Sequence, residues 1–166
     1  MAAHRFRTKK PIDPIARLMQ EHDTALLHLS GLSKATKSLA EEGFSADNYR
    51  RVLSALQFIE EEVRIHNKSE EEALFPVLER YVEGPTKLMR RDHRKMKKEF
   101  VRLRRCVNRL GKNHDDREAA IDLLNIGKAI IQMFVNHIHK ENHILFPLVQ
   151  KFLTKDALRE VARRML

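Results

Sequence analysis

Two stretches of the sequence share one pattern, HNKSEEEALFP (residues 66–76) and HIHKENHILFP (residues 137–147). Each begins with a histidine, has a glutamate four residues later and ends in Leu-Phe-Pro. On an α-helix, side chains four residues apart lie on one face, with their Cβ atoms roughly 5–6 Å apart. Each stretch therefore predicts a helix that offers an imidazole and a carboxylate to one side. The proline that follows would kink or end that helix.

The two stretches belong to a longer repeat with a period of 71 residues. Without a gap, this shift superposes His66 on His137 and Glu70 on Glu141. It also aligns residues that would begin, fill and end helices: Pro14 with Pro85, His22 with His93, Leu32 with Leu103, Leu39 with Leu110 and Ile59 with Ile130. Two helical hairpins that each bury one face against the other would give such a repeat.

Signals for helix starts and ends divide the chain into five helical segments. N-cap residues and a proline in a first turn mark starts, and glycines and polar turns mark ends. In chain order these signals are Asp13-Pro14, Gly43, Ser45, Gly84-Pro85, Gly111, residues 113–116 and Thr154. Apolar residues recur with helical spacing between them, and no useful length alternates with a period of two. The sequence predicts an all-α protein: an antiparallel up-down four-helix bundle built from two repeated helical hairpins, with a short C-terminal fifth helix.

Composition agrees with this interpretation and excludes several classes of protein. The chain has 166 residues, which suits one domain, and its 5 Gly, 5 Pro and 33% charged residues favour helices. Cys106 is the single cysteine, so no internal disulfide can form. The most apolar stretch, residues 129–135, is too short to cross a membrane.

The beginning of the sequence is basic and lacks the apolar core of a secretory signal. We therefore expect a flexible basic segment at residues 1–13, a metal-binding bundle at residues 14–166, and a cytoplasmic protein.

Six side chains that can bind metals are predicted to face the interior of the bundle, because they lie on the apolar stripes of their helices. They are His22, His66, Glu70, His93, His137 and Glu141. His22 and His66 each lie about 20 residues from the first turn, roughly 30 Å at 1.5 Å per residue, so the hairpin brings them level. The second hairpin does nearly the same for His93 and His137.

Two buried carboxylates without partners would be destabilising by several kcal/mol each, and a metal removes this conflict. Imidazole with carboxylate suits iron or manganese, and the lack of thiolates argues against structural zinc. Six ligands are too many for one tetrahedral ion. They suit two metals that share both carboxylates, with two histidines on each metal.

Other interpretations carry less weight. A lone inward histidine is ordinarily a core residue. Four inward histidines with two glutamates at a duplicated spacing instead indicate a metal site. His114 and Glu118 have the same spacing but straddle a polar turn outside the repeat. Glu62, one turn before His66, could orient that imidazole or be exposed to solvent. The Glu-x-x-His pairs that ferritin-like bundles need are absent from the sequence, and Cys106 is interpreted as an unreactive thiol.

The two quoted stretches resemble the paired signatures of the hemerythrin-like (HHE cation-binding) domain family. Glu21-His22-Asp23 and Asp92-His93 resemble the single-histidine helices of that family, so the similarity covers roughly residues 14–150. It implies an antiparallel four-helix bundle that holds two iron ions in a non-haem di-iron centre with an oxo or hydroxo bridge. It also implies that Glu70 and Glu141 are the bridging ligands and that the centre meets oxygen, peroxide or nitric oxide.

The sequence departs from the oxygen-carrying hemerythrins at one position. Those proteins have a His-x-x-x-His pair on the third helix, whereas Lys97 stands four residues after His93 here. The more open centre suits peroxide or nitric oxide chemistry, sensing or iron handling in oxidative or nitrosative stress. A reversible oxygen carrier or storage protein is an alternative. The residues leave open whether the protein is an enzyme, and no catalytic residue is assigned.

The net charge of +9 is concentrated in the third helix. Between Lys87 and Lys112 there are 12 Lys or Arg residues against only Asp92 and Glu99. A solvated face is the simpler interpretation. The alternative is an iron-dependent sensor or adaptor that binds an acidic partner or nucleic acid through this helix. Of these two partners, nucleic acid is the less expected one, because no nucleic-acid motif or interleaved surface aromatics accompany the charge.

Overall fold

The computed structural model describes residues 13–165, and every regular element in this part of the chain is a helix. The prediction of an all-α bundle is therefore confirmed. The basic segment predicted at residues 1–13 lies outside the described residues except for Asp13. Within the described part of the chain, no helix is long and apolar enough to cross a membrane.

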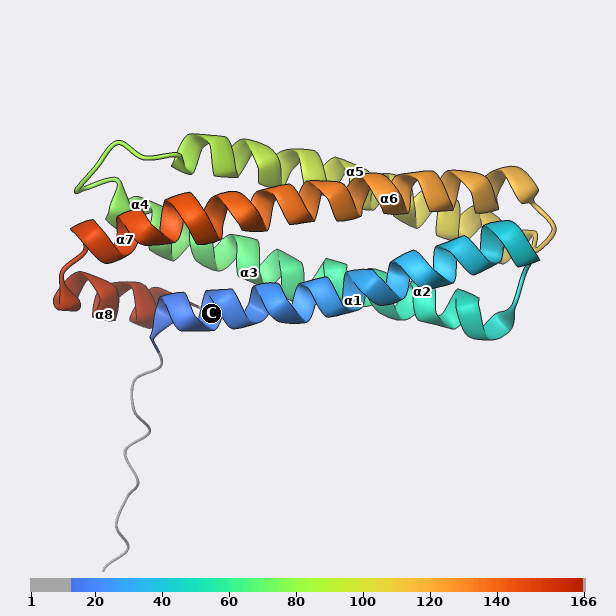
Figure 1. The fold of residues 1–166 in the computed structure, drawn as a ribbon, viewed down its shortest axis with the longest axis horizontal. Helices are drawn as coiled ribbons and strands as arrows, with labels where there is room; N and C mark the ends of the chain where they lie inside the picture. The colour runs from blue at the N-terminus through green and yellow to red at the C-terminus, as the bar shows by residue number, and fades with distance from the viewer. Residues whose placement is uncertain (1–12, 166) are drawn as a thin grey trace, which may run out of the picture.

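Four long helical rods lie side by side, and a short helix follows them (Figure 1). The first rod is α1 (Pro14–Glu42) and the third is α5 (Thr86–Lys112). The second is α2 (Ala46–Phe58), α3 (Arg64–Ser69) and α4 (Phe75–Leu78), joined by the π-helical turns η1 (Ile59–Val63) and η2 (Glu70–Leu74). The fourth is α6 (Arg117–Lys140), the π-helical turn η3 (Glu141–Leu145) and α7 (Phe146–Phe152), and α8 (Lys155–Arg164) follows it. Contacts join α1 to α2 and α6, and α5 to α6 and α2.

The predicted helix starts and ends have a local chemical cause in the structure. The Asp13 side chain accepts a hydrogen bond from the backbone N–H two residues later, at 2.9 Å. Ser45, Asp116 and Thr154 each accept one from the N–H three residues later, which satisfies a free donor of the first turn. Gly43 follows α1 with a φ of 93°, a value that residues with a Cβ rarely adopt.

Of the two alternatives predicted for Pro76 and Pro147, a kink or a helix end, the structure excludes the helix end at the proline itself. Helical structure continues to Leu78 and Phe152. A π-helical turn precedes each proline. In a regular α-helix, the proline ring would press against the carbonyl four residues earlier. We attribute the continuation of both helices to the wider turn, which relieves this contact.

The π-helical turns also determine which side chains face the bundle interior. The N–H of Phe75 donates to the carbonyl of Glu70, and the N–H of Phe146 donates to that of Glu141, five residues back in each case. In a regular α-helix, side chains five residues apart point about 140° away from each other. A π-helical turn, in which residues five apart are joined by a backbone hydrogen bond, brings them to one side of the helix. The phenylalanines therefore lie on the same face as the glutamates.

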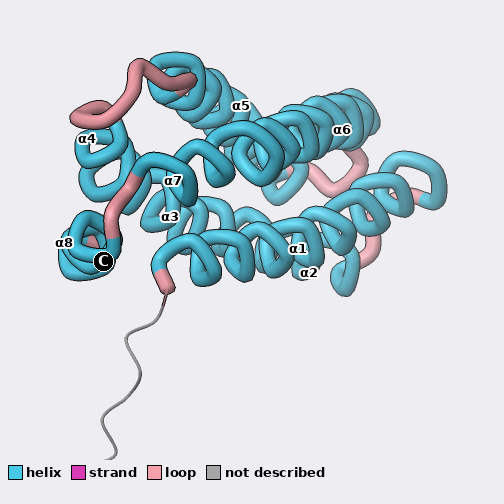
Figure 2. The backbone as a smooth tube through the Cα atoms, turned by 60° about the vertical axis from the view of Figure 1, so that its left-hand side comes forward, coloured by secondary structure: helices cyan, strands magenta, loops and turns pink. Residues whose placement is uncertain are grey.

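Buried apolar side chains form two separate clusters along the bundle. The larger includes Leu32, Leu56 and Leu103 on the side of the Gly43 turn. The smaller gathers side chains from α1, the two Leu-Phe-Pro segments, α5 and α8: Ile15, Leu18, Ala73, Leu74, Phe75, Val77, Leu78, Met89, Leu145, Phe146, Val149, Leu153, Ala157 and Val161. Figure 2 shows α8 at the end of the bundle where α1 begins and α7 ends. The six predicted metal-binding residues lie between the two clusters along the helices.

Candidate metal centre

The structure brings all six predicted residues together. They form two groups that share both glutamates: His22, His66, Glu70 and Glu141 in one, and Glu70, His93, His137 and Glu141 in the other. Within each group, one ligand atom from every residue lies within 4.8 Å of the others. We call His22 with His66 the His22 pair, and His93 with His137 the His93 pair. Both groups are able to hold a metal.

Each glutamate divides its two oxygens between the two pairs. Oε1 of Glu70 lies 3.2 Å from Nε2 of His66, and Oε2 lies 3.2 Å from Nε2 of His93. Oε2 of Glu141 lies 2.8 Å from Nε2 of His22, and Oε1 lies 2.8 Å from Nε2 of His137. Two carboxylates that each face two imidazole pairs have the arrangement of bridging ligands between two cations.

The burial of these carboxylates tests whether a cation fits. Glu70 and Glu141 are both 0% exposed, and none of their four oxygens accepts a hydrogen bond. The closest polar atoms are the histidine nitrogens, which are not aligned as N–H donors. Two ionised carboxylates in this position are destabilising unless a cation lies between them and the imidazoles. The residues present therefore fit a pair of metal ions.

Four polar side chains hold the outer nitrogens of the histidines, and we call them the outer ring. Nδ1 of His66 lies 2.7 Å from Glu21 and that of His93 lies 2.7 Å from Glu71. Nδ1 of His137 lies 3.4 Å from Asp92, and that of His22 lies 3.0 Å from Asn142 Oδ1. Because these oxygens accept, each Nδ1 donates a proton, and each Nε2 faces the centre, where it can hold either a second proton or a metal.

The inner nitrogens of each pair converge on one point. Nε2 of His22 is 3.2 Å from Nε2 of His66, and Nε2 of His93 is 3.0 Å from Nε2 of His137. If neither nitrogen of a pair carried a proton, their two lone pairs would repel each other at this separation. A cation in contact with both removes the repulsion, as ligands of one metal do.

Of the two alternatives that the sequence left open for Glu62, the structure supports solvent exposure. Glu62 is exposed, and Glu21 from α1 orients His66 instead. Sequence spacing identifies neighbours along one helix, whereas Glu21 reaches His66 from another helix. The 71-residue repeat contained a signal for the outer ring, since it superposes Glu21 on Asp92 and Glu71 on Asn142.

The phenylalanines of the Leu-Phe-Pro segments pack on two of the histidines. The Phe146 ring stacks on His22 with centroids 5.6 Å apart, and the Phe75 ring stacks on His93 with centroids 6.1 Å apart. Both rings are almost completely buried. They fix the planes of the imidazoles and exclude water from one side of the centre.

The pKa values of these groups follow from the crowding of acids and imidazoles. Burial lowers the pKa of His66, but the charge of Glu70 and the contact with Glu21 raise it to about 10. Burial also opposes the charged form of His93, yet the surrounding carboxylates, Glu141 first, raise its pKa to about 11. Burial raises the pKa of Glu141, and the histidines around it hold it well below its ordinary value. A bound cation would compete with protons for these nitrogens.

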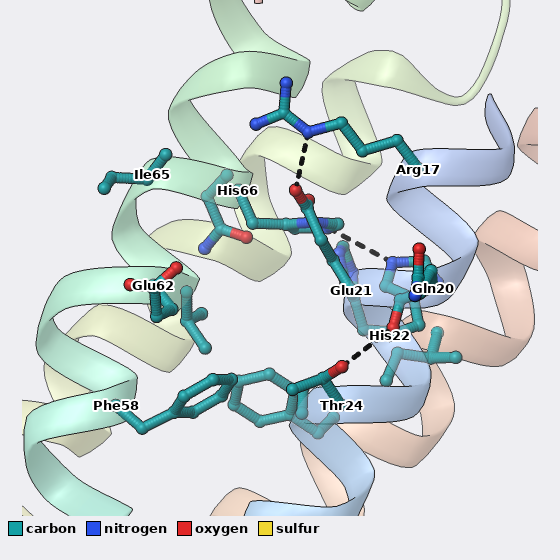
Figure 3. A pocket seen from close by; sticks show the side chains of 15 residues that line it. Arg17, Gln20, Glu21, His22, Thr24, Phe58, Glu62, Ile65 and His66 are labelled. Carbon is teal, nitrogen blue, oxygen red and sulfur yellow. Dashed lines mark hydrogen bonds and ion pairs between the residues drawn. The ribbon is translucent and has the colours of Figure 1, made fainter. Parts of the chain in front are cut away.

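A cavity of about 300 Å³ reaches the His22 pair from the side of α1 (Figure 3). Arg17 and Glu21 lie at one end of it and Phe58 at the other, with His22 and His66 between them. Ala25, Val63, Phe134 and Ile138 also line it. The lining thus combines apolar and polar side chains, and His137 of the other pair also borders it.

A second cavity, of about 470 Å³, lies between the second rod and α5 and includes His93. Lys97, at the position of the missing fifth histidine, lines this cavity and is exposed, so it is outside the groups that can hold a metal. Four more cations share the lining: Arg64, Lys68, Arg94 and Arg104. The basic face of α5 thus continues to the edge of the candidate centre.

Two other residues considered from the sequence lie outside the centre. His114 stacks on Phe44 with centroids 3.7 Å apart, which agrees with its rejection as a ligand. Cys106 is buried, and burial raises the pKa of its thiol. A thiol in this state is a poor nucleophile, which agrees with the interpretation of an unreactive cysteine.

Comparison with known protein families gives one result. The family model described as the hemerythrin HHE cation binding domain matches residues 13–149 and again residues 84–166. The second match begins 71 residues after the first, which is the period of the internal repeat (84 − 13 = 71). None of the curated proteins matches the sequence. Because the first match covers most of the chain, and the six side chains lie where a cation fits, the chain belongs to the hemerythrin HHE cation-binding domain family.

Proposed function

We propose that the chain binds two iron ions at His22, His66, Glu70, His93, His137 and Glu141, and that the reduced centre reacts with oxygen, peroxide or nitric oxide. The observation that carries this proposal is the division of each buried carboxylate between the two histidine pairs. Such a centre serves the response to oxidative or nitrosative stress, the sensing of these molecules, or iron handling.

The donor set supports iron. Imidazole and carboxylate ligands suit iron or manganese, and the described part of the chain brings no thiolate into either group. Of these two metals, iron is the one that the family resemblance of the sequence implies. Iron would supply the electrons that reduce oxygen or peroxide and the affinity for nitric oxide.

The protein's own residues would hold and shield the metals. The outer ring fixes each imidazole with its Nε2 atom toward the centre. Phe75 and Phe146 cover the rings of His93 and His22. The apolar part of the 300 Å³ cavity gives small neutral molecules a route to the His22 pair. Each metal would be held by two histidines and the two glutamates, and such a set of four residues would leave room for an exogenous ligand.

One observation favours a second function, the binding of an acidic partner. In the 470 Å³ cavity, Arg64, Arg94 and Lys97 come together beside the apolar side chains of Ile59 and Phe100. Among the described residues, none of these three cations forms an ion pair with an acidic side chain. An acidic segment of another protein would find unpaired positive charge next to His93 there.

The first prediction concerns metal content. Purified protein reconstituted with iron should contain about two irons per chain, with near-ultraviolet absorption of ferric iron and no haem bands. Glu70→Ala or Glu141→Ala should lower the iron content and the melting temperature of the iron-loaded protein, because the metals join all four rods. Glu72→Ala is the matched control, since Glu72 lies in the same turn as Glu70 but is exposed. One zinc, or no metal after reconstitution, would count against the site.

The second prediction concerns pH. In the metal-free protein, His66 and His93 bind protons more tightly when folded. Their contribution to stability is complete below the ordinary pKa of 6.5 and is lost as pH rises through about 10 and about 11. Urea unfolding of chelator-treated protein should show the free energy of unfolding falling from pH about 6.5 to about 9. The metal-loaded protein should lack this loss, because metal has replaced the protons. A flat profile in the metal-free protein would contradict the assigned charge state.

The third prediction concerns reactivity. Anaerobic, reduced protein is mixed in a stopped-flow spectrophotometer with oxygen, hydrogen peroxide or nitric oxide. Oxygen and peroxide should oxidise the centre, and nitric oxide should bind directly, because each metal has room for a ligand. Oxygen that returns under vacuum would instead support the reversible carrier. Inertness to all three reagents would leave storage of iron as the function.

The fourth prediction concerns the acidic partner. The double variant Arg94→Glu/Lys97→Glu should abolish binding of a partner in a pull-down at low salt while leaving the iron content unchanged. Lys34→Glu/Lys37→Glu on the exposed face of α1 makes the same change in net charge and is the control. If the wild-type protein binds no partner in a salt-sensitive way, or if both double variants lose the binding equally, the cavity is not the binding surface.

A further inference from the structure

The two halves of the candidate centre have identical ligands but differ in the outer-ring residues that contact those ligands. The 71-residue shift superposes Glu21 on Asp92, which are both acids, and Glu71 on Asn142, which are an acid and an amide. As a result, three of the four Nδ1 atoms donate to a carboxylate and only that of His22 donates to a neutral oxygen.

Neighbouring cations increase this difference. Arg17 forms an ion pair with Glu21 at 3.0 Å, and Lys140 contacts Asp92, so each of these two acids has a direct counter-charge. Glu71 contacts only His93, at 2.7 Å, among the ion pairs of the described residues. The contact with His93 lowers the pKa of Glu71, and the positive charges of Arg90 and Arg94 help to lower it. Neither arginine forms an ion pair with Glu71 among the described residues, and Arg90 is paired with Glu79. Glu71 is therefore less directly neutralised than Glu21 and Asp92, and it is the acid that holds Nδ1 of His93 where His22 has only an amide.

A carboxylate and an amide affect a bound metal differently through the same imidazole. An anionic acceptor on Nδ1–H increases the electron density that Nε2 gives to a metal, and its charge attracts the cation over the intervening distance. A neutral amide orients the ring but adds no charge. Access does not distinguish the two pairs, because a cavity reaches each of them.

We propose that the two metal positions are unequal, and that Asn142 makes them so. This inference rests on the proposed function. The position at the His93 pair takes the first cation and holds it more tightly. The position at the His22 pair is the weaker one, from which a metal exchanges. Asn142 acts on the metal through His22, so it is a positioning residue and not a ligand.

A stepwise titration of metal-free protein with Co²⁺ under anaerobic conditions tests this assignment by calorimetry and visible absorption. Two steps of different affinity are not sufficient evidence, since a first cation repels a second even at equal positions. The test is which step responds to a change in the outer ring. Asn142→Asp keeps the size and shape of the side chain and adds the charge that Glu71 already supplies in the other half.

If the positions are unequal as proposed, Asn142→Asp should strengthen the weaker step by about 10–100-fold and leave the tighter step almost unchanged. If the positions were equal, a tenfold gain at one of them would strengthen the tighter step by about fivefold and the weaker by only about twofold, by mass action. The two cases therefore predict changes in different steps, and the visible spectrum of the first bound Co²⁺ should stay the same only in the proposed case.

Glu71→Gln is the opposite change and should weaken the tighter step toward the weaker one. Glu72→Gln alters an exposed neighbour of the same type and should change neither step. Thermal unfolding of each metal-free variant checks that the fold is retained.

An increase of the tighter step in Asn142→Asp, or no change in either step, would overturn the inequality. Failure of wild-type protein to bind two cations would instead count against the proposed function, so the two failures can be told apart.

Discussion

Two carboxylates buried between four imidazoles are the constraint on which the rest of the structure depends. Glu70 and Glu141 are fully buried and accept no hydrogen bond, in a place where apolar clusters lie on both sides. A charge in this position is tolerated only with a compensating charge in contact. Without a metal, protons on His66 and His93 supply part of that compensation, which is why the pKa values of both histidines are raised. The bundle thus has a strong preference for a cation at this level.

The backbone meets this constraint by departing from the regular α-helix at the two glutamates. The π-helical turns begin at Glu70 and Glu141 and end one residue before Phe75 and Phe146. Each turn places a ligand and the ring that covers a histidine on the same face, and each precedes a proline that a regular helix would not accommodate. The Leu-Phe-Pro segments are therefore part of the centre and not only the place where two helices approach their ends.

Much of the fold followed from local signals, because helix caps act within three residues. Ser45, Asp116 and Thr154 each hold the N–H that their position predicts. The six central residues were also predictable, since their spacing and duplication place them on inward stripes. The residues that contact the outer nitrogens from other helices were not predictable in this way, and Glu21, which contacts His66 from α1, is an example. Spacing gives the neighbours of a residue on its own helix, whereas the rotation and level of another helix depend on the packing of the whole bundle. The π-helical turns were missed for a related reason, because a proline alone does not tell a kink from a widened turn.

The internal repeat explains why any difference between the two halves must come from outside the ligands. Lys97, where a fifth histidine would stand, superposes on Leu26, so neither half has an additional ligand at this position. Both halves keep a histidine on each rod and one glutamate shared across the centre. The remaining differences are residues such as Asn142 and Glu71, which touch only the outer nitrogens. Because these residues carry different charge and each contacts the outer nitrogen of a ligand, a duplicated scaffold can hold two chemically distinct positions without a change in any ligand.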